Sequence, residues 1–179
     1  KKSNFRVLPR AIWSGQAVKS DEVADLYPKL NERGIPLTII SNNKPDMPGE
    51  YNYYPWSYYS FPKNIIRGDF CISPRRTDNT YDLGHSHFKI GIFMAQGVPA
   101  IASPIPSYKE LIEKTNAGKI CKFEADWDET LDKIVNEPEI LNKWSEAAHQ
   151  GMKEYSTESV SKKYKLFFEY LLNDKKGGV

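Results

Sequence analysis

The sequence predicts an open α/β fold of three layers, in which helices cover both faces of a mostly parallel sheet. Short apolar segments of strand length alternate along the chain with segments of helical periodicity. This alternation is typical of parallel strands joined by right-handed helical crossovers. At 179 residues the chain is long enough for one domain with its own core. We therefore predict a single domain over residues 1–172 and a disordered tail over residues 173–179.

Composition places the chain among globular proteins and removes several functional classes. Hydrophobic residues make up 40% and aromatic residues 13%, which excludes an intrinsically disordered chain. The net charge of +2 argues against a nucleic-acid partner, because such proteins carry a concentrated basic excess. No apolar run reaches the roughly 18 residues of a transmembrane segment. Cys71 and Cys121 each lie inside a predicted strand without metal-binding spacing, which indicates buried, reduced thiols.

The first predicted strand is the short apolar segment 11–13, and a helix should follow it. Ser20 can cap the start of this helix, and Gly34 can close it in the left-handed conformation. Pro28 lies inside the helical pattern and should kink it. The unbroken apolar run 35–40 then predicts a strand that is covered on both faces.

The middle of the chain contains more turn-forming residues. Segment 42–52 is rich in them, and it leads through Tyr-Tyr-Pro-Trp to a short helix near 60–66. The run 69–74 predicts the next strand, which its final proline should end. A loop then leads to a helix that begins near Ser86 and ends at Gly97.

The last part of the chain predicts two more strands and four helices. The strands are expected over 99–103 and 118–123, and the helices over 107–115, 126–135, 138–152 and 158–172. Asp126 and Asp128 form a D-x-D pair, which binds a metal–nucleotide complex in other enzymes. Here the pair opens a helix, where aspartates favour the positive end of the dipole, so we interpret it as a cap.

Polar loops after the strands are where a ligand is expected, because open α/β sheets bind ligands at the carboxyl ends of their strands. The loops are SGQAVK, PWS, SPRRTD and GHSHFK. Ser14 and Gly15 permit close backbone approach after the first strand. The helix that starts near Ser86 offers free backbone N–H groups to an anion.

Cationic and aromatic side chains on these loops favour a nucleoside diphosphate over a neutral metabolite. Lys19, Arg75, Arg76 and Lys89 can neutralise a phosphate or diphosphate. Trp56 can stack on a planar base.

Each of these features also has a plainer structural interpretation. The Arg75–Arg76 pair can belong to a solvated loop, and Ser86 can be an N-cap only. His85 and His87 could form a metal pair, but no third ligand lies nearby in the sequence, so no metal is expected. The absence of G-x-x-x-x-G-K-[ST] and G-x-G-x-x-G patterns weakens the case for a P-loop or a standard dinucleotide site.

The segment SHFKIGIFMAQGVPAIAS, followed by SYKELI, resembles the donor-binding half of GT-B glycosyltransferases. It is most similar to family 4 and its relatives, where the pattern S-x-x-K-x-x-E-x-M-A-x-G-x-P-V-I-A-S recurs. Flanking segments follow the family's order over residues 10–170. The resemblance implies a Rossmann-like domain, one half of a GT-B fold, that binds a nucleoside-diphosphate sugar. It also implies an N-terminal acceptor-binding domain that this chain lacks, with the reaction in the cleft between the two.

The resemblance assigns donor-binding roles to four segments. The loop after the first strand would approach the diphosphate, Trp56 would lie near the base, and the arginine pair would border the donor sugar and phosphates. The segment 85–89 would cradle the diphosphate and sugar. The expected donor-binding residues are Ser14, Gly15, Gln16, Lys19, Trp56, Arg75, Arg76, His85, Ser86, His87, Phe88 and Lys89. No catalytic residue is assigned, and neither a metal nor another cofactor is expected.

The sequence departs from the family pattern at three positions. Ile92 replaces the glutamate that holds the ribose, and Gly84 stands where retaining members carry a second acidic residue. Gln16 stands where an arginine is usual.

Three hypotheses follow. The first is the donor-binding domain of a glycosyltransferase of polysaccharide biosynthesis, in the cytoplasm or at the inner face of the membrane through the missing domain. The second is a non-catalytic GT-B-like binding or scaffold module, which the lost acidic residues favour. The third is a nucleotide-sugar epimerase, which would need catalytic acids and a histidine in a second domain.

Overall fold

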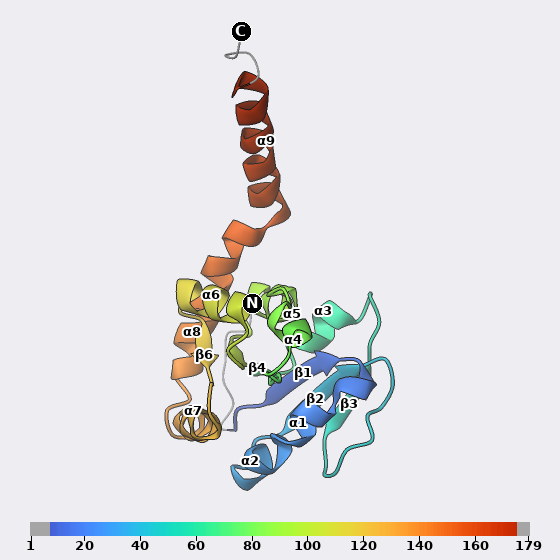
Figure 1. Cartoon of the computed structure of the whole chain (residues 1–179). Helices are drawn as coiled ribbons and strands as arrows, with labels where there is room; N and C mark the ends of the chain where they lie inside the picture. Colours follow the sequence, from blue (N-terminus) through green and yellow to red (C-terminus); the bar gives the residue numbers. More distant parts are fainter. Residues whose placement is uncertain (1–7, 175–179) are drawn as a thin grey trace.

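The computed structural model describes residues 8–174, and its centre is a six-stranded sheet (Figure 1). All neighbouring strands are parallel, in the order β3-β2-β1-β4-β5-β6. The strands are β1 (Ala11–Gly15), β2 (Leu37–Ser41), β3 (Asn52–Pro55), β4 (Phe70–Ser73), β5 (Ala100–Ala102) and β6 (Gly118–Ile120). The predicted Rossmann-like, three-layer α/β class is thus confirmed.

Helices cover both faces of this sheet and bury two separate apolar cores. One core lies under α1 (Asp21–Ala24), α2 (Tyr27–Glu32) and α7 (Glu124–Asn136). The other lies under helices α3 (Phe61–Ile65), α5 (Phe88–Ala95), α6 (Pro106–Thr115) and α8 (Ile140–Gly151). The sheet separates the two cores, which makes three layers. The remaining helical segments are η1 (Ala17–Lys19), α4 (Thr80–Leu83), η2 (Met152–Tyr155) and α9 (Thr157–Asp174).

The observed strands correspond to the predicted ones except at the β3 edge of the sheet. Every residue of β2 and β4 is buried, as expected for strands covered on both faces. Edge strand β3 was not predicted, because its Tyr-Tyr-Pro segment follows a run of turn-forming residues. Its residues are exposed or half-buried, and it pairs with β2 only. An edge position tolerates the proline at its end.

The predicted helix from Ser20 to Gly34 is divided into two. Helix α1 ends at Ala24, and α2 starts at Tyr27 with Pro28 in its first turn. Proline is favoured there because a first-turn N–H has no partner within the helix. Ser20 is the N-cap residue of α1 as predicted, but its buried side chain makes no capping hydrogen bond. Gly34 has φ +64° and closes the helix as predicted.

The helix expected near Ser86 begins two positions later, at Phe88. His87 is its N-cap residue, and Ser86 is exposed and caps nothing. The loop before it contains helix α4, which the sequence analysis missed. The Asn79 side chain caps this helix by accepting from the Asp82 N–H at 2.8 Å.

The last helix, α9, extends away from the rest of the domain (Figure 1). It includes the predicted segment 158–172 and runs on to Asp174, into the segment predicted as a tail. The rest of that predicted tail lies outside the described residues. Within residues 8–174, no helix is both long and apolar enough to cross a membrane.

Candidate functional site

A cavity of about 700 Å³ opens at the carboxyl end of the sheet, and we call it the central cavity. It lies beside β1 and β4, where the strand order reverses, which is the usual ligand position in sheets of this topology. Its walls come from the end of β1, the segment η1, the loops after β3 and β4, and the helices α3, α4 and α5.

Most of the residues predicted from the sequence line this cavity together. They are Ser14, Gly15, Gln16, Lys19, Trp56, Arg75, His85, Phe88 and Lys89. Three predicted residues lie elsewhere. Arg76 is exposed and lines a neighbouring cavity, Ser86 is exposed, and the His87 ring packs against the Tyr155 ring at 5.0 Å between centroids.

Trp13 forms part of the cavity wall and explains the glycine that follows it. A Cβ atom at Gly15 would lie 2.5 Å from Cζ2 of the Trp13 indole. The glycine is therefore needed to let this buried indole fold over the end of β1. From the sequence, this glycine was expected to allow close approach of a ligand, so the structure gives a second reason for the same residue.

Lys89 places its ammonium group against the same indole. Its Nζ lies 4.9 Å from the centroid of the Trp13 ring. Burial, with a further contribution from the positive charge of Arg75, lowers the pKa of Lys89 to about 7. Near pH 7 the side chain is therefore only partly protonated, and an anion in the central cavity would stabilise its charged form.

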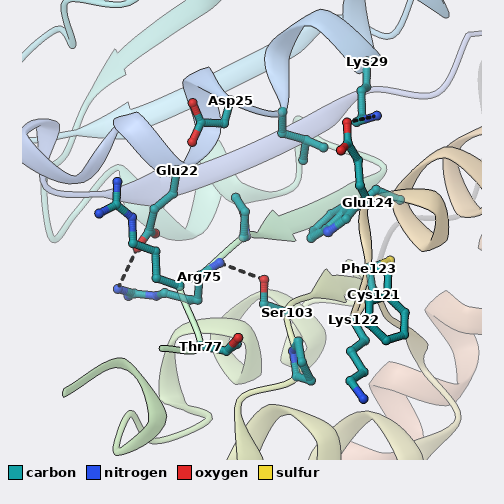
Figure 2. A pocket seen from close by; sticks show the side chains of 15 residues that line it. Glu22, Asp25, Lys29, Arg75, Thr77, Ser103, Cys121, Lys122, Phe123 and Glu124 are labelled. Atoms are coloured by element: carbon teal, nitrogen blue, oxygen red, sulfur yellow. Dashed lines mark hydrogen bonds and ion pairs between the residues drawn. The ribbon is translucent and has the colours of Figure 1, made fainter. Parts of the chain in front are cut away.

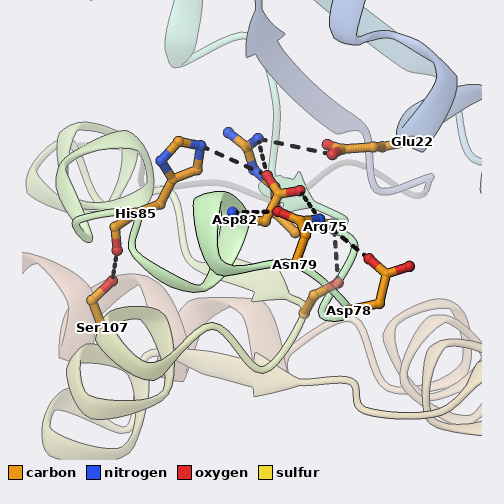
Figure 3. Close-up of polar contacts among 8 residues, drawn as sticks. Glu22, Arg75, Asp78, Asn79, Asp82, His85 and Ser107 are labelled. Carbon is orange, nitrogen blue, oxygen red and sulfur yellow. Dashed lines mark hydrogen bonds and ion pairs between the residues drawn. The ribbon is translucent and has the colours of Figure 1, made fainter.

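Arg75 does not offer a free positive charge to the cavity. Its side chain is 10% exposed, and its Nη1 lies 3.1 Å from Asp82 Oδ1 and 3.8 Å from Glu22 Oε1 (Figure 3). From the sequence, Arg75 was expected either to bind phosphate or to lie in a solvated loop. The structure instead shows a buried ion-pair network, with Arg75 between two carboxylates.

The two carboxylates respond to this environment in opposite ways. Burial alone would raise the pKa of Asp82, but the hydrogen bond from Asn79 and the charge of Arg75 outweigh it and lower that pKa. For Glu22 burial dominates and raises the pKa. Asp82 therefore holds the negative charge that compensates Arg75 across the neutral pH range.

His85 lines the central cavity next to this network. Its Nε2 lies 3.8 Å from Asp82 Oδ1, and its ring packs against Tyr81 at 4.9 Å between centroids. Burial and the charge of Arg75 lower the pKa of His85, so the ring is neutral at pH 7. His85 and His87 thus contact different tyrosines, and no cluster of three or more His, Cys, Asp or Glu side chains suited to a metal occurs within residues 8–174.

The D-x-D pair has a structural role. Asp126 Oδ2 accepts from the N–H groups of Lys122 at 2.7 Å and of Phe123 at 2.9 Å, which caps the start of α7. Asp128 pairs with Lys29 at 2.7 Å and with Arg33 at 3.1 Å, which ties α7 to α2. The interpretation of this pair as a cap is confirmed for Asp126, and Asp128 adds a contact between helices.

Several cavity residues were missed by sequence reasoning. The apolar part of the wall comes from residues interpreted as core or not considered, among them Trp13, Phe61 and Phe93. The position of Asp82 could have been predicted in part. Asn79 lies three residues earlier, and the resulting N-x-x-D pattern is typical of a helix start. No sequence signal points to Glu22 as a partner of Arg75, because the contact depends on how α1 packs against the loop after β4.

Comparison with known proteins identifies solved structures with a similar fold. No protein-family model and no curated protein matches the sequence. Among solved structures, TarM from S. aureus matches with a TM-score of 0.67 and 13% identity, over 92% of this chain and 36% of TarM. The lipopolysaccharide glycosyltransferase WaaG matches with a TM-score of 0.64 and 12% identity, over 83% of this chain and 44% of WaaG. The chain has the fold of a GT-B glycosyltransferase domain.

This chain corresponds to only part of the longer structures that it matches. The GT-B domain described here spans less than half the length of TarM and of WaaG. By contrast, it covers 89% of the C-terminal CMP-Kdo binding domain of WaaA from Acinetobacter baumannii, with a TM-score of 0.51 and 14% identity. The predicted resemblance to GT-B enzymes is confirmed for the fold, and the likeness to family 4 stays a prediction.

Proposed function

We propose that the central cavity of this GT-B domain binds the nucleoside-diphosphate-sugar donor of a glycosyltransferase. The observation that carries the proposal is the position of the cavity, where the loops after β1, β3 and β4 meet the start of α5. The volume of about 700 Å³ is in the range of small-molecule sites. The likeness to the CMP-Kdo binding domain of WaaA supports a nucleotide-linked sugar as ligand class.

Different residues of the central cavity would contact different parts of the donor. Lys89 and Lys19 would contact the diphosphate, together with the free N–H groups at the start of α5. Trp56, with half of its surface exposed, would stack on the base. These cations and N–H groups would stabilise the departing nucleoside diphosphate without a metal ion.

The proposed function also requires a second domain that binds the acceptor. The surface of α9 supports it, because Tyr164, Phe167, Phe168 and Leu171 lie three or four residues apart on one helix face and are all exposed within the described chain. The apolar stripe they form would pack on that domain. We further propose polysaccharide or glycoconjugate synthesis in the cytoplasm, or at the inner face of the membrane, as the setting.

The alternative function is a GT-B-like module that no longer supports transfer. Two observations favour it. Ile92 puts an apolar side chain in the cavity wall where the family pattern has the ribose-binding glutamate, and Arg75 is already compensated by Asp82 and Glu22. Such a module would bind the donor weakly or serve as a scaffold for the other domain.

Thermal unfolding with a panel of UDP, GDP, ADP, CMP and their sugar conjugates tests the proposal. A ligand at one hundred times its dissociation constant stabilises the native state by about 2.7 kcal/mol, which raises the melting temperature by several degrees. We expect a clear rise with one base, and a much smaller rise in Lys89→Met. The matched control is Lys165→Met on α9, which should respond like the unmodified chain. If neither the chain nor the complete protein responds to any nucleotide at millimolar concentration, the donor-binding proposal is wrong and the scaffold function is favoured.

A further inference from the structure

The lining of the central cavity falls into two chemically different groups. Its charged residues are all basic and lie on η1, on the loop after β4 and at the start of α5; they are Lys19, Arg75 and Lys89. The second group, which we call the carbon wall, comes from α3 and α5 and has no polar atom in its side chains. It consists of Phe61, Pro62, Phe88, Ile92 and Phe93. Within the described part of the chain, no carboxylate lines this cavity.

A second cavity, which we call the side cavity, opens beside the central one (Figure 2). It has a volume of about 390 Å³ and lies at the carboxyl ends of β4, β5 and β6, between α1, α2 and α7. Arg75 lines both cavities, and the carboxylates of Glu22, Asp25 and Glu124 line the side cavity. A diphosphate would be repelled by these carboxylates, so its place is in the central cavity, where the charged side chains are all basic.

Helix α5 determines which part of a nucleotide meets the carbon wall. Ile92 follows Lys89 by three residues, so the two side chains are neighbours on the helix surface, with Cβ atoms about 5 to 6 Å apart. This is close to the separation between the α-phosphate of a nucleotide and the centre of its ribose ring. With the diphosphate at Lys89, the ribose would therefore lie against Ile92.

A row of aromatic rings leads from this point to the rim of the central cavity. The rings of Phe93 and Phe61 meet edge to face with centroids 6.1 Å apart, and the rings of Phe61 and Trp56 are 6.3 Å apart. Trp56 is 51% exposed, so a base can stack on it. The edge of that base would lie beside Phe61, where a methyl group gains an apolar contact and a polar substituent does not.

The carbon wall disfavours hydroxyl groups on the ribose. A hydroxyl group that faces it loses hydrogen bonds to water and gains no acceptor in return. In dinucleotide-binding sheets of related topology, an Asp or Glu accepts from the ribose 2′-hydroxyl. The corresponding side chain in contact with the ribose here would be Ile92, which cannot accept a hydrogen bond. A 2′-deoxyribose presents one hydroxyl group fewer and a CH₂ group in its place.

We propose that the central cavity selects a 2′-deoxyribonucleoside diphosphate with thymine as its base, so that the donor is a sugar linked to deoxythymidine diphosphate. This inference rests on the proposed donor function and specifies the nucleotide part of that donor. The 2′-carbon would pack on Ile92 and the thymine methyl group on Phe61, while Lys89 and Lys19 hold the diphosphate.

Isothermal titration calorimetry with four nucleotides tests the proposal. The diphosphates of deoxythymidine (dTDP), deoxyuridine (dUDP), uridine (UDP) and 5-methyluridine vary the 2′-hydroxyl and the 5-methyl group independently. We expect loss of the 2′-hydroxyl to tighten binding about tenfold, because a buried hydroxyl without a partner is costly. The methyl group should tighten binding about fourfold through its burial.

A substitution on the carbon wall tests the role assigned to Ile92. Ile92→Gln supplies an acceptor for the 2′-hydroxyl, so the preference for dUDP over UDP should fall from about tenfold to nearly none. The matched control is Ile66→Gln, at an isoleucine that is 42% exposed at the end of α3 and does not line the cavity. It should keep the tenfold preference, and the melting temperature of each variant verifies its fold.

The outcomes separate this inference from the donor proposal on which it rests. If UDP binds as tightly as dUDP, or if Ile92→Gln keeps the full preference for dUDP, the selection of a deoxyribose at Ile92 is wrong and the donor proposal stands. If the methyl group has no effect on affinity, thymine is not the selected base. If none of the four nucleotides binds and a ribonucleotide of another base does, the inference fails alone. If no nucleoside diphosphate binds, both proposals fail.

Discussion

At the scale of single residues, the central cavity contains two half-buried cations that behave differently. Arg75 is held between Asp82 and Glu22, and its charge is compensated before any ligand arrives. Lys89 instead faces the Trp13 indole and has a pKa of about 7. Arg75 thus shapes the wall between the two cavities, while Lys89 is the cation that an anionic ligand can charge.

The pKa of Lys89 leads to a prediction for the pH dependence of binding. A bound diphosphate raises this pKa, so above pH 7 binding must take up a proton. The affinity for a nucleoside diphosphate should then fall as the pH rises from 7 to 9, by up to about tenfold per unit. Isothermal titration calorimetry in two buffers of different ionisation enthalpy measures both effects. In Lys89→Met we expect weak, pH-independent binding over this range, and a flat profile in the unmodified chain would contradict the role of Lys89.

Removing the carboxylate of Asp82 should destabilise the domain. Asp82→Asn leaves Arg75 buried with only the more distant Glu22, so we expect a loss of about 3 kcal/mol in the free energy of unfolding at pH 7. Because the pKa of Asp82 is lowered by folding, this contribution is present above the ordinary carboxyl pKa and disappears as the pH falls through the lowered value. Urea unfolding at pH 7 and at successively lower pH measures it.

The matched control for this prediction is Asp78→Asn on the same loop, where the carboxylate is exposed. It should change the stability by less than about 0.5 kcal/mol. If Asp82→Asn changed the free energy of unfolding as little as Asp78→Asn does, the ion pair between Arg75 and Asp82 would not contribute to stability, and the prediction would be wrong.

Residue roles were predictable where the chemistry is local, and not where it depends on packing. Strand and helix periodicity places Ser14 at the end of β1 and Lys89 at the start of α5, and both residues line the central cavity. The pairing of Arg75 with Glu22 joins residues more than fifty positions apart, and no pattern in the sequence encodes it. The capping role of Asp126 was predictable because the contact lies within four residues.

At the scale of elements, boundaries were harder to predict than identities. Pro28 was expected to kink a helix, and the structure starts a new helix around it, because proline is best accommodated in a first turn. Strand β3 was missed because an edge strand needs neither a continuous apolar run nor strict alternation. Helix α5 begins after Ser86 because the start depends on the path of the preceding chain, which α4 determines.

Helix α9 carries a prediction about the partner domain. In the chain alone, Phe167→Glu should leave the melting temperature nearly unchanged, since the side chain is 54% exposed and its ring contacts Phe168 of the same helix. In a form that also contains the proposed acceptor-binding domain, the same change should lower the stability, because it would place a charge in an apolar contact. Thermal unfolding and limited proteolysis of both forms measure this.

The control for α9 is Lys162→Glu, which lies on the opposite face of the helix from the apolar stripe. It should leave both forms nearly unchanged, because the ion pair that it breaks, with Glu158 at 2.6 Å, is exposed. An equal response of the complete protein to the two variants would mean that the stripe does not face the partner domain.

At the scale of the whole molecule, the order of the strands determines where both cavities lie. Chains leaving β1 and β4 diverge to opposite sides of the sheet, which leaves the central cavity between them. The side cavity arises next to it because the loops after β4, β5 and β6 border a space between the helices of the other face. The alternation of strands and helices in the sequence predicts the class of fold and the rim, but it does not predict that the rim holds two cavities.

The four tryptophans are distributed so that the chain carries its own optical reporters. Trp13 and Trp56 line the central cavity, and Trp127 lines the side cavity. Indole emission responds to nearby charge and to exposure, so a molecule entering either cavity would alter a different part of the fluorescence spectrum. Protonation of Lys89 beneath its ligand would be visible at Trp13, 4.9 Å away. Filling of the central cavity can thus be followed in real time without attaching a dye.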